Sequence, residues 1–435
     1  CTPTRSKPSP TPVPFALRFV KSPMTQLEKL PLNLTRFLVF LVPASVLAVK
    51  SVMQLCLVLL LGLALVKLVK VRAQPLTVEE RLLAWSLVLY PASVLLGFVW
   101  LGQFPWPEFD APSRFMLVAP ILVFLTRVEA PSFIEYRWGC ALGAMAAAAW
   151  ALWTVNLPNA AHFNRATNGF TNPIPFACIA LILAFSALPD RSQKRLGERV
   201  ALWIAMLAGA GAAVASESRA VLLVLPLACV LYFFSYRQKG IMQRAHVVWV
   251  GIAAVVLAGS VAFVLKDRLR VTIQDLSSQS SAAADSSIGT RFQIWSASAR
   301  VFLDHPWLGV GRGNLPLEFK RMADSQEMTQ WAAGFKHSHN EMLFLLAETG
   351  IAGALAVLAV YVGFLVAFCK RFRAADPRIR STAYAGIVTI LSYILFGLTD
   401  CLLTISMQTA FFALSIVLLY ATIRQRERLA APPHG

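Results

Sequence analysis

The chain has 435 residues, of which 57% are hydrophobic and only 14% are charged, whereas an average soluble domain has about 25% charged residues. This composition excludes a soluble globular domain and predicts an all-α integral membrane protein, because lipid cannot satisfy the open edges of a sheet. The formal net charge of +18 could suggest a nucleic-acid partner, but the basic residues gather in short connections between apolar segments. We therefore expect membrane lipids and no nucleic acid as partners.

The N-terminal segment is rich in proline, serine and threonine and lacks the apolar core of a signal peptide. We expect residues 1–33 to be a disordered tail, or a tail foreign to the natural protein, with Met24 as a candidate native start. The seven cysteines show neither a disulfide framework nor the spacing of a zinc site.

Apolar runs of the length that crosses a bilayer recur along the rest of the chain and predict about twelve transmembrane helices. Nine of them fall within residues 34–265 and three within 341–423, and a polar loop, 266–340, separates the two groups. A short tail, 424–435, follows the last helix. The predicted spans are 34–49, 51–71, 82–101, 114–128, 133–155, 173–188, 199–216, 219–236, 246–265, 341–369, 381–399 and 402–423.

The basic clusters predict the orientation of these spans. If the N-terminus is cytoplasmic and the spans alternate, every cluster falls on the cytoplasmic side, as the positive-inside rule requires. Both termini are then cytoplasmic, and the loop 266–340 lies on the opposite side. The clusters lie at residues 67–81, 191–199, 237–244, 370–380 and 424–428.

The long loop is predicted to be partly helical. Thr290 is a candidate cap for a helix that ends at Pro306, and a second amphipathic segment follows at 315–335. The apolar face of the first helix is expected to consist of Phe292, Trp295, Ala299 and Phe302. Loops of this length are commonly lids or binding elements, so we expect this one to fold back over the membrane surface.

Two histidines lie where this loop enters the tenth span, in the segment Phe335–Leu343. Titratable side chains are costly at a bilayer edge, so this cluster indicates a functional site. A neutral His339 could take a proton from a hydroxyl nucleophile, whereas a protonated imidazole beside Asn340, at the helix N-terminus, could hold a phosphate. The alternative is that His337 and His339 only cap the helix at the interface.

Arg219 is a candidate phosphate ligand, because a guanidinium is permanently charged and can contact phosphate with two N–H groups. It opens the eighth span directly after Ser218, on the same side of the membrane as His339. The alternative is that Arg219 reaches lipid headgroups or pairs with Glu217.

Arg291 and Arg312 could add further cationic groups on this side. Arg291 lies at the start of the predicted loop helix, and the alternative is a solvated helix end. Arg312 lies in the glycine-rich run 309–313, which is a weak match to a phosphate-cradling turn because no predicted strand precedes it. A plain tight loop is the alternative for this run.

His162, Arg165 and Asn168 form a candidate donor group in another external loop. Asp400 and Glu341 could orient His339 or an arginine. We find no nucleotide fingerprint and no metal-ligand cluster in the sequence of the external segments. Neither a metal nor a cofactor is therefore expected.

Three stretches of the chain resemble the bacterial O-antigen ligases, which belong to a larger superfamily of membrane ligases and polymerases. The resemblance extends over about residues 160–423 and includes the layout of twelve spans with one large loop, a GT-C-like architecture. The family's His-Asn-x-x-Leu-x6-Gly motif is matched by His339, Asn340, Leu343 and Gly350. Its Ser-x-Ser-Arg element is matched by Ser216–Arg219. Its Arg-x-x-x-Trp element is matched from Arg291 to Trp295, and the His-Pro-x-x-Gly-x-Gly element that follows is matched from His305 to Gly311.

The resemblance implies an enzyme of the bacterial inner membrane whose active site faces the periplasm. Its donor would be a glycan linked to undecaprenyl pyrophosphate, and its acceptor the lipid A-core oligosaccharide. Arg219 and Arg291 would bind the pyrophosphate, and His339 would activate the acceptor hydroxyl, giving inversion at the anomeric carbon without a metal. His337, Asn340, Ser218, Arg312, His162 and Arg165 would contact the substrates.

Other functions remain open from the sequence. A polymerase or a protein O-oligosaccharyltransferase of the same superfamily would differ only in the acceptor, which the sequence does not specify. A transporter could also have about twelve helices, but it should show internal symmetry and polar, broken spans near the middle of the membrane. In this chain the polar candidates gather on one side.

Overall fold

The structure, a computed structural model, describes residues 26–70, 75–127, 133–156, 165–190, 192–236, 259 and 287–430. Every regular element that it contains within these ranges is a helix. The first group comprises α1 (Gln26–Ser45), α2 (Val52–Lys70), α3 (Val78–Leu101), α4 (Trp106–Arg127), α5 (Phe133–Val155), α6 (Pro173–Ser186), α7 (Leu196–Ala215) and α8 (Val221–Tyr236). The second comprises α11 (Ser287–Asp304), α12 (Leu315–Asp324), α13 (Gln330–Ala333), α14 (Glu341–Cys369), α15 (Pro377–Gly397), the 3-10 helix η1 (Leu402–Thr404) and α16 (Ser406–Ala430).

The predicted spans that fall on described residues are helical, which confirms the all-helical fold. Eight of the described helices are long and apolar enough to cross a membrane, and three shorter apolar helices accompany them. The ninth predicted span, 246–265, lies outside the described residues apart from residue 259. The number twelve and the division of the chain into domains therefore stay predictions.

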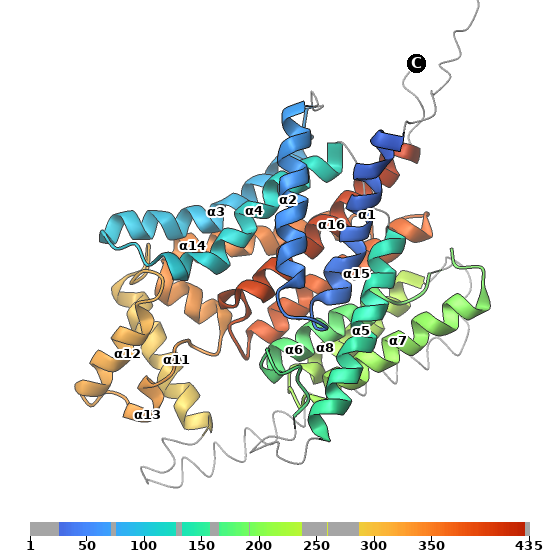
Figure 1. Cartoon of the computed structure of the whole chain (residues 1–435). Coiled ribbons are helices and arrows are strands. Elements are labelled where there is room, and N and C mark those ends of the chain that lie inside the picture. Colours follow the sequence, from blue (N-terminus) through green and yellow to red (C-terminus); the bar gives the residue numbers. More distant parts are fainter. Residues whose placement is uncertain are drawn as a thin grey trace, which may run out of the picture.

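The helices form a bundle with α15 and α16 at its centre (Figure 1). In the most apolar 18 residues of α16 and α15, 83% and 78% of the residues are buried, whereas the share is 28% in α2 and in α7. Outward side chains of the peripheral helices, such as Leu55 on α2 and Leu207 on α7, are apolar and exposed. A soluble protein would not leave such large apolar surfaces uncovered, so they are the surfaces that lipid contacts.

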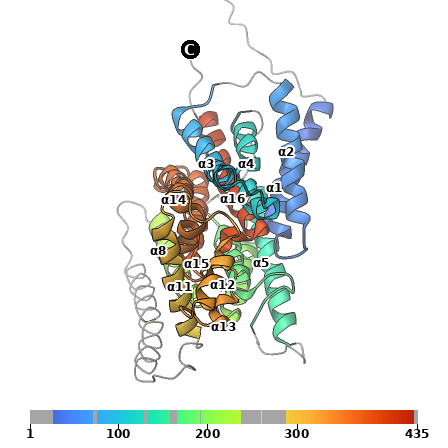
Figure 2. The same cartoon turned by 90° about the vertical axis from the view of Figure 1, so that its left-hand side faces the viewer.

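Helices α11, α12 and α13 form a small layer that packs on the first turns of α14 (Figures 1 and 2). Their shared core contains Ile294 and Phe319, and it continues into Phe344 of α14 and Cys401. This part of the long loop is thus a folded unit that is attached to the bundle where the histidines lie.

Two details of the predicted loop helix are wrong. The helix begins at Ser287, so Thr290 lies inside its first turns and does not cap it. Its buried face consists of Ile294, Ala297, Ser298 and Val301, whereas Phe292 of the predicted face is exposed. The polar Ser298 does not look like part of an apolar face in the sequence. It can be buried because its hydroxyl donates a hydrogen bond to the carbonyl of Ile294.

Helix α14 is broken at Gly350, which has φ 61° and ψ −163°. The break frees helical hydrogen-bonding groups, and the loop segment 306–311 satisfies them. The N–H groups of Ile351 and Ala352 donate to the carbonyls of Pro306 and Trp307, at 2.8 and 3.2 Å. The carbonyls of Ala347 and Glu348 accept from the N–H groups of Val310 and Gly311, both at 3.0 Å. We call these four hydrogen bonds the kink ladder.

The opposite end of the bundle contains a buried ionic cluster around Glu80. This side chain is fully buried and pairs with Arg127, with Arg424 at 3.3 Å and with Arg428 at 3.0 Å. Helix α16 continues to Ala430, so residues 424–430 are helical, and the cytoplasmic tail 424–435 stays a prediction.

Candidate functional site

The segment between the loop and α14 is held from two sides. Asn340 is the N-cap of α14, with φ −154° and ψ 113°, and its Oδ1 accepts the N–H of Leu343 at 3.2 Å. Such a cap satisfies a backbone donor that the helix cannot satisfy itself. The sequence predicted substrate contact for Asn340, but the structure uses its side-chain oxygen to cap the helix.

Ser338 anchors this segment to α11. Its hydroxyl shares a hydrogen bond of 2.8 Å with the hydroxyl of Ser298, and its carbonyl accepts the indole N–H of Trp295 at 2.9 Å. Ser338 is fully buried. The residue between the two histidines is therefore fixed against the loop layer, and this fixes where the histidines can lie.

His339 adopts a left-handed backbone conformation with φ 48°. Non-glycine residues in this region are uncommon and are often found at functional sites. The backbone N–H of His339 donates to Nδ1 of His337 at 3.4 Å, and the two ring centroids are 4.4 Å apart. The strained turn thus brings both imidazoles together.

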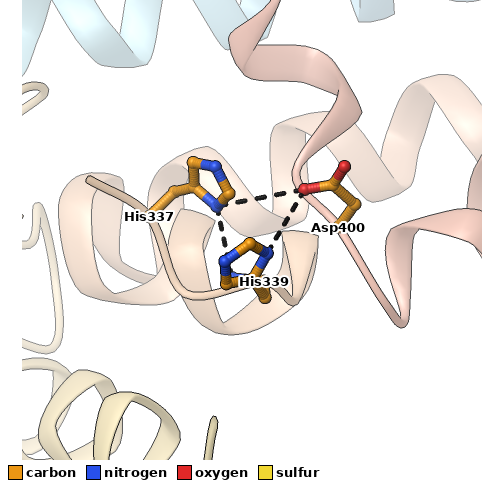
Figure 3. A group of neighbouring side chains, drawn as sticks. All are labelled: His337, His339 and Asp400. Carbon is orange, nitrogen blue, oxygen red and sulfur yellow. Dashed lines mark hydrogen bonds and ion pairs between the residues drawn. The ribbon is translucent and has the colours of Figure 1, made fainter. Parts of the chain in front are cut away.

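Asp400, which follows α15, completes the cluster (Figure 3). Its Oδ1 lies 3.6 Å from Nδ1 of His339 and 4.0 Å from Nδ1 of His337. The chain places Asp400 there through Glu341, whose carboxylate accepts the N–H of Leu403 at 2.9 Å and so joins the start of α14 to η1. We call His337, His339 and Asp400 the histidine–aspartate cluster.

The electrostatics of this cluster favour an ionised carboxylate, while burial disfavours protonation of His337. Burial alone would raise the pKa of Asp400, but contact with His339 and the charge of His337 bring it below its ordinary value. Burial lowers the pKa of His337, and the neighbouring His339 lowers it further, while Asp400 opposes the change. A neutral imidazole with an ionised carboxylate at one nitrogen is suited to act as a base through the other.

The same three side chains could also hold a metal ion. One ligand atom from each lies within 4.8 Å of the others. The sequence suggests Asp400 as a partner of His339 but not a metal-ligand group, because the distance of Asp400 from both histidines depends on the fold. Histidine nitrogen and carboxylate oxygen are common ligands of divalent transition metals.

Arg219 lies in a turn that other residues fix. Glu217 has φ 54°, and the hydroxyl of Ser216 accepts the N–H of Ser218 at 3.2 Å. Nε of Arg165 donates to the carbonyl of Ser216 at 2.7 Å. Arg165, predicted to contact substrate, therefore supports the turn that presents the exposed Arg219, whereas Ser218 is buried.

Arg219 lies at the same end of the bundle as Asp400. The hydroxyl of Tyr384 on α15 donates to the carbonyl of Ala228, and the hydroxyl of Tyr232 donates to the carbonyl of Pro189 near the start of α15. Helix α8 therefore runs antiparallel to α15, and its first residues lie towards the end of α15 that leads to Asp400. Within the described part of the chain, no hydrogen bond or ion pair joins Arg219 to the histidine–aspartate cluster.

The two remaining loop arginines differ in environment. Arg291 lies on α11 one turn before Trp295, whose indole donates to the carbonyl of Ser338. Arg312 is buried, pairs with Glu348 at 3.3 Å and stacks over the ring of Phe344 at 4.7 Å. This environment favours a structural function for Arg312 over the predicted contact with substrate.

Two further predictions have different outcomes. His162 lies outside the described residues. The glycine run 309–313 contributes two of the four hydrogen bonds of the kink ladder, through Val310 and Gly311, so a tight structural loop describes it better than a phosphate-cradling turn. Gly309 is required there, because a Cβ atom on it would lie 2.4 to 2.6 Å from the backbone of residues 347–349.

Comparison with known families gives one match, and a search of curated proteins found none. Residues 204–358 match the family model described as O-antigen ligase. The matched segment includes the Arg219 turn, the loop layer and both histidines, and the structure brings these parts to one end of the bundle. The match and this arrangement support the assignment of the chain to the O-antigen ligase family.

Proposed function

We propose that the protein transfers a polysaccharide from undecaprenyl pyrophosphate to the lipid A-core oligosaccharide, at the periplasmic face of the bacterial inner membrane. The transfer inverts the anomeric carbon and uses no metal. The observation that carries this proposal is the histidine–aspartate cluster, whose two histidines lie within the family-matched segment, directly before α14. A donor anchored in lipid requires such a location, because its pyrophosphate stays near the membrane surface.

Arg219 and Arg291 are proposed to bind the donor pyrophosphate. A pyrophosphate leaving group carries increasing negative charge as its bond to the sugar breaks, and fixed guanidinium groups stabilise that charge. The exposed Arg219 side chain and the turn that Arg165 supports are consistent with this function. Arg291 is included because it lies one turn before Trp295, which bonds to the segment that holds the histidines.

His339 is proposed to be the general base. Asp400 lies next to Nδ1, which favours the tautomer that has its proton on Nδ1 and leaves Nε2 free to accept one. Nε2 then takes the proton of the acceptor hydroxyl as the oxygen attacks the anomeric carbon opposite the pyrophosphate. The 3.6 Å separation of Nδ1 and Oδ1 needs only a small ring rotation to become a hydrogen bond.

The test is in vitro transfer by the purified protein from a lipid-pyrophosphate glycan. Lipid A-core, a second lipid-linked glycan and a serine peptide are offered as acceptors, each with and without a chelator. We expect transfer to lipid A-core, unchanged by the chelator. Preference for the second glycan or the peptide would instead identify a polymerase or a protein O-oligosaccharyltransferase, and loss of activity with chelator would make the cluster a metal site.

Variants connect this activity to the site. We expect His339→Ala to lower the transfer rate about 10²- to 10⁴-fold, and Arg219→Ala about 10²- to 10³-fold. Arg321→Ala is the matched control, because Arg321 lies in the same loop, is exposed and pairs with Glu318 one turn away. Normal rates in folded His339→Ala and Arg219→Ala proteins would contradict the proposal.

A further inference from the structure

A cavity lined by four arginines lies at the end of the bundle remote from His339. Its volume is about 260 Å³, and it opens between the first turns of α1, α5 and α15 and the last turns of α16. Helix α15 has 21 residues and runs from this cavity to the segment that holds Asp400, which separates the two sites by about 30 Å. The four arginines are Arg36, Arg137, Arg378 and Arg426.

Two of these arginines have N–H groups for which no described residue is a partner. Arg137 is 1% exposed and binds Asp190 at 2.6 Å and Ser381 at 3.1 Å, but its buried Nε has no partner. The half-buried side chain of Arg378 makes no ion pair or hydrogen bond within the described residues. Buried N–H donors are normally satisfied, so Nε of Arg137 indicates a missing acceptor. Arg378 adds an unpaired cation to the same lining.

The charge of the cavity also favours an anion. Among its lining residues, Asp190 is the acidic one, and it already binds Arg137. Arg36 and Arg426 pair with carboxylates outside the lining, Glu135 at 3.8 Å and Asp376. These two pairs are partly exposed, so solvent weakens them, and they leave Arg378 without compensation.

The rim of the cavity is apolar. Leu32, Ile134 and Leu429 line it together with the arginines. On α1 and α5, within one turn of the lining residues, Phe37 and Trp138 are exposed, as are other apolar side chains that face the surrounding lipid. A ligand with a phosphate and attached hydrocarbon chains fits both parts, whereas free phosphate uses only the arginines.

We propose that this arginine-lined cavity binds the phosphate group of an anionic phospholipid, whose acyl chains lie along α1 and α5. Basic pockets between transmembrane helices are suited to such headgroups. Pockets that enclose a whole small molecule usually have a volume of about 300 to 1,000 Å³, and this cavity is slightly smaller. It therefore accommodates the phosphate and headgroup of the lipid, while the acyl chains stay outside it.

The experiment is a lipid titration of the full-length protein in detergent, followed by thermal unfolding. The probes are phosphatidylglycerol, phosphatidylcholine and inorganic phosphate. We expect phosphatidylglycerol to raise the Tm with an apparent affinity about tenfold higher than that of phosphatidylcholine. A tenfold ratio corresponds to the free energy that one hydrogen bond to a charged group contributes. Equal effects of the two lipids would overturn the proposal, and an equal effect of inorganic phosphate would show a phosphate site without lipid.

Three variants locate the effect. Arg378→Gln removes the unpaired guanidinium and should weaken phosphatidylglycerol binding about tenfold. Gln425→Glu places a negative charge in the lining at almost constant size and should weaken it similarly, so it decides the matter if Arg378→Gln does not fold. Arg373→Gln, an exposed arginine near the same end but outside the lining, should leave the affinity unchanged. Equal losses in the Arg373 and Arg378 variants would contradict a specific site.

Discussion

The backbone of His339 is strained, and its neighbours provide the energy that holds it. A left-handed conformation at a non-glycine residue costs about 1 to 3 kcal/mol. This cost is offset by the Asn340 cap, the two hydrogen bonds of Ser338 and the hydrogen bond from the backbone of His339 to Nδ1 of His337. The strain therefore has a use: it turns the imidazole towards Asp400 while the residues on both sides stay fixed.

Asp400→Asn should separate catalysis from binding. If Asp400 acts through His339, the substitution lowers kcat about 10- to 100-fold, part of the range that a general base contributes, and changes the KM for the donor little. Because the contact with His339 and the charge of His337 lower the pKa of Asp400, its carboxylate is ionised at working pH. Removal of this charge should move the acid side of the pH–rate profile to lower pH. Steady-state kinetics from pH 5 to 9 measures both effects.

Asp304→Asn is the control for this prediction. Asp304 is exposed at the end of α11, in the same loop layer, and should tolerate the change. A raised KM with normal kcat in Asp400→Asn would instead indicate that Asp400 contacts the substrate directly.

At the scale of elements, the break in α14 explains why the loop and the bundle form one unit. The kink ladder makes the segment 306–311 a substitute for a missing helical turn, and Arg312 with Glu348 adds a buried ion pair beside it. The first turns of α14, which follow directly from the histidines, are thereby fixed relative to the loop layer that holds Ser338.

Gly350→Ala should disrupt this connection. The backbone of Gly350 lies in a region that essentially only glycine adopts, and a Cβ atom would lie 2.3 Å from the carbonyl group of Trp307. Strain and overlap together should cost more than about 3 kcal/mol, so we expect a large fall in Tm and loss of transfer activity. Gly97→Ala, in a helix with open space around the position, should be neutral or slightly stabilising. Equal thermal stability of the two variants would show that the kink is not required.

The sequence predicts some of these features for physical reasons and not others. Spans are predictable because lipid imposes length and hydrophobicity on each helix separately. The predicted face of α11 was wrong because Ser298 is buried by its bond to Ser338, which the local pattern does not contain. Asp400 was only a candidate orienting group, since its distance from His339 depends on the packing of α14 against α15.

At the scale of the whole molecule, the charges of the two ends have different functions. Near the histidines the described charges are few and surround a candidate site. At the opposite end, several arginines are locked in ion pairs, as Arg424 and Arg428 are with Glu80. Part of the basic clustering that predicted topology is therefore also structural.

Glu80→Gln should lower stability without changing the chemistry. It leaves Arg127, Arg424 and Arg428 without their shared buried carboxylate, and loss of one partner of a buried pair costs about 3 to 5 kcal/mol. We expect a lower Tm in detergent, with a normal kcat below that temperature because the site lies at the other end. Glu198→Gln, in an exposed pair with Arg195 at 3.9 Å, should leave the Tm unchanged. A normal Tm in Glu80→Gln would mean that the cluster contributes no stability.

The orientation of the molecule is the prediction on which access of the substrates depends. The basic clusters favour the cytoplasm for the arginine-rich end, which puts the histidine–aspartate cluster on the periplasmic side. Cysteines introduced at Asp304, near the histidines, and at Arg373, at the other end, would both be exposed. In intact cells, a membrane-impermeant maleimide should label Asp304→Cys and spare Arg373→Cys, and both should react after lysis. The parent protein measures the background from the natural cysteines, of which Cys229 and Cys369 are exposed. The reverse pattern would put the cluster in the cytoplasm, away from a periplasmic donor and acceptor.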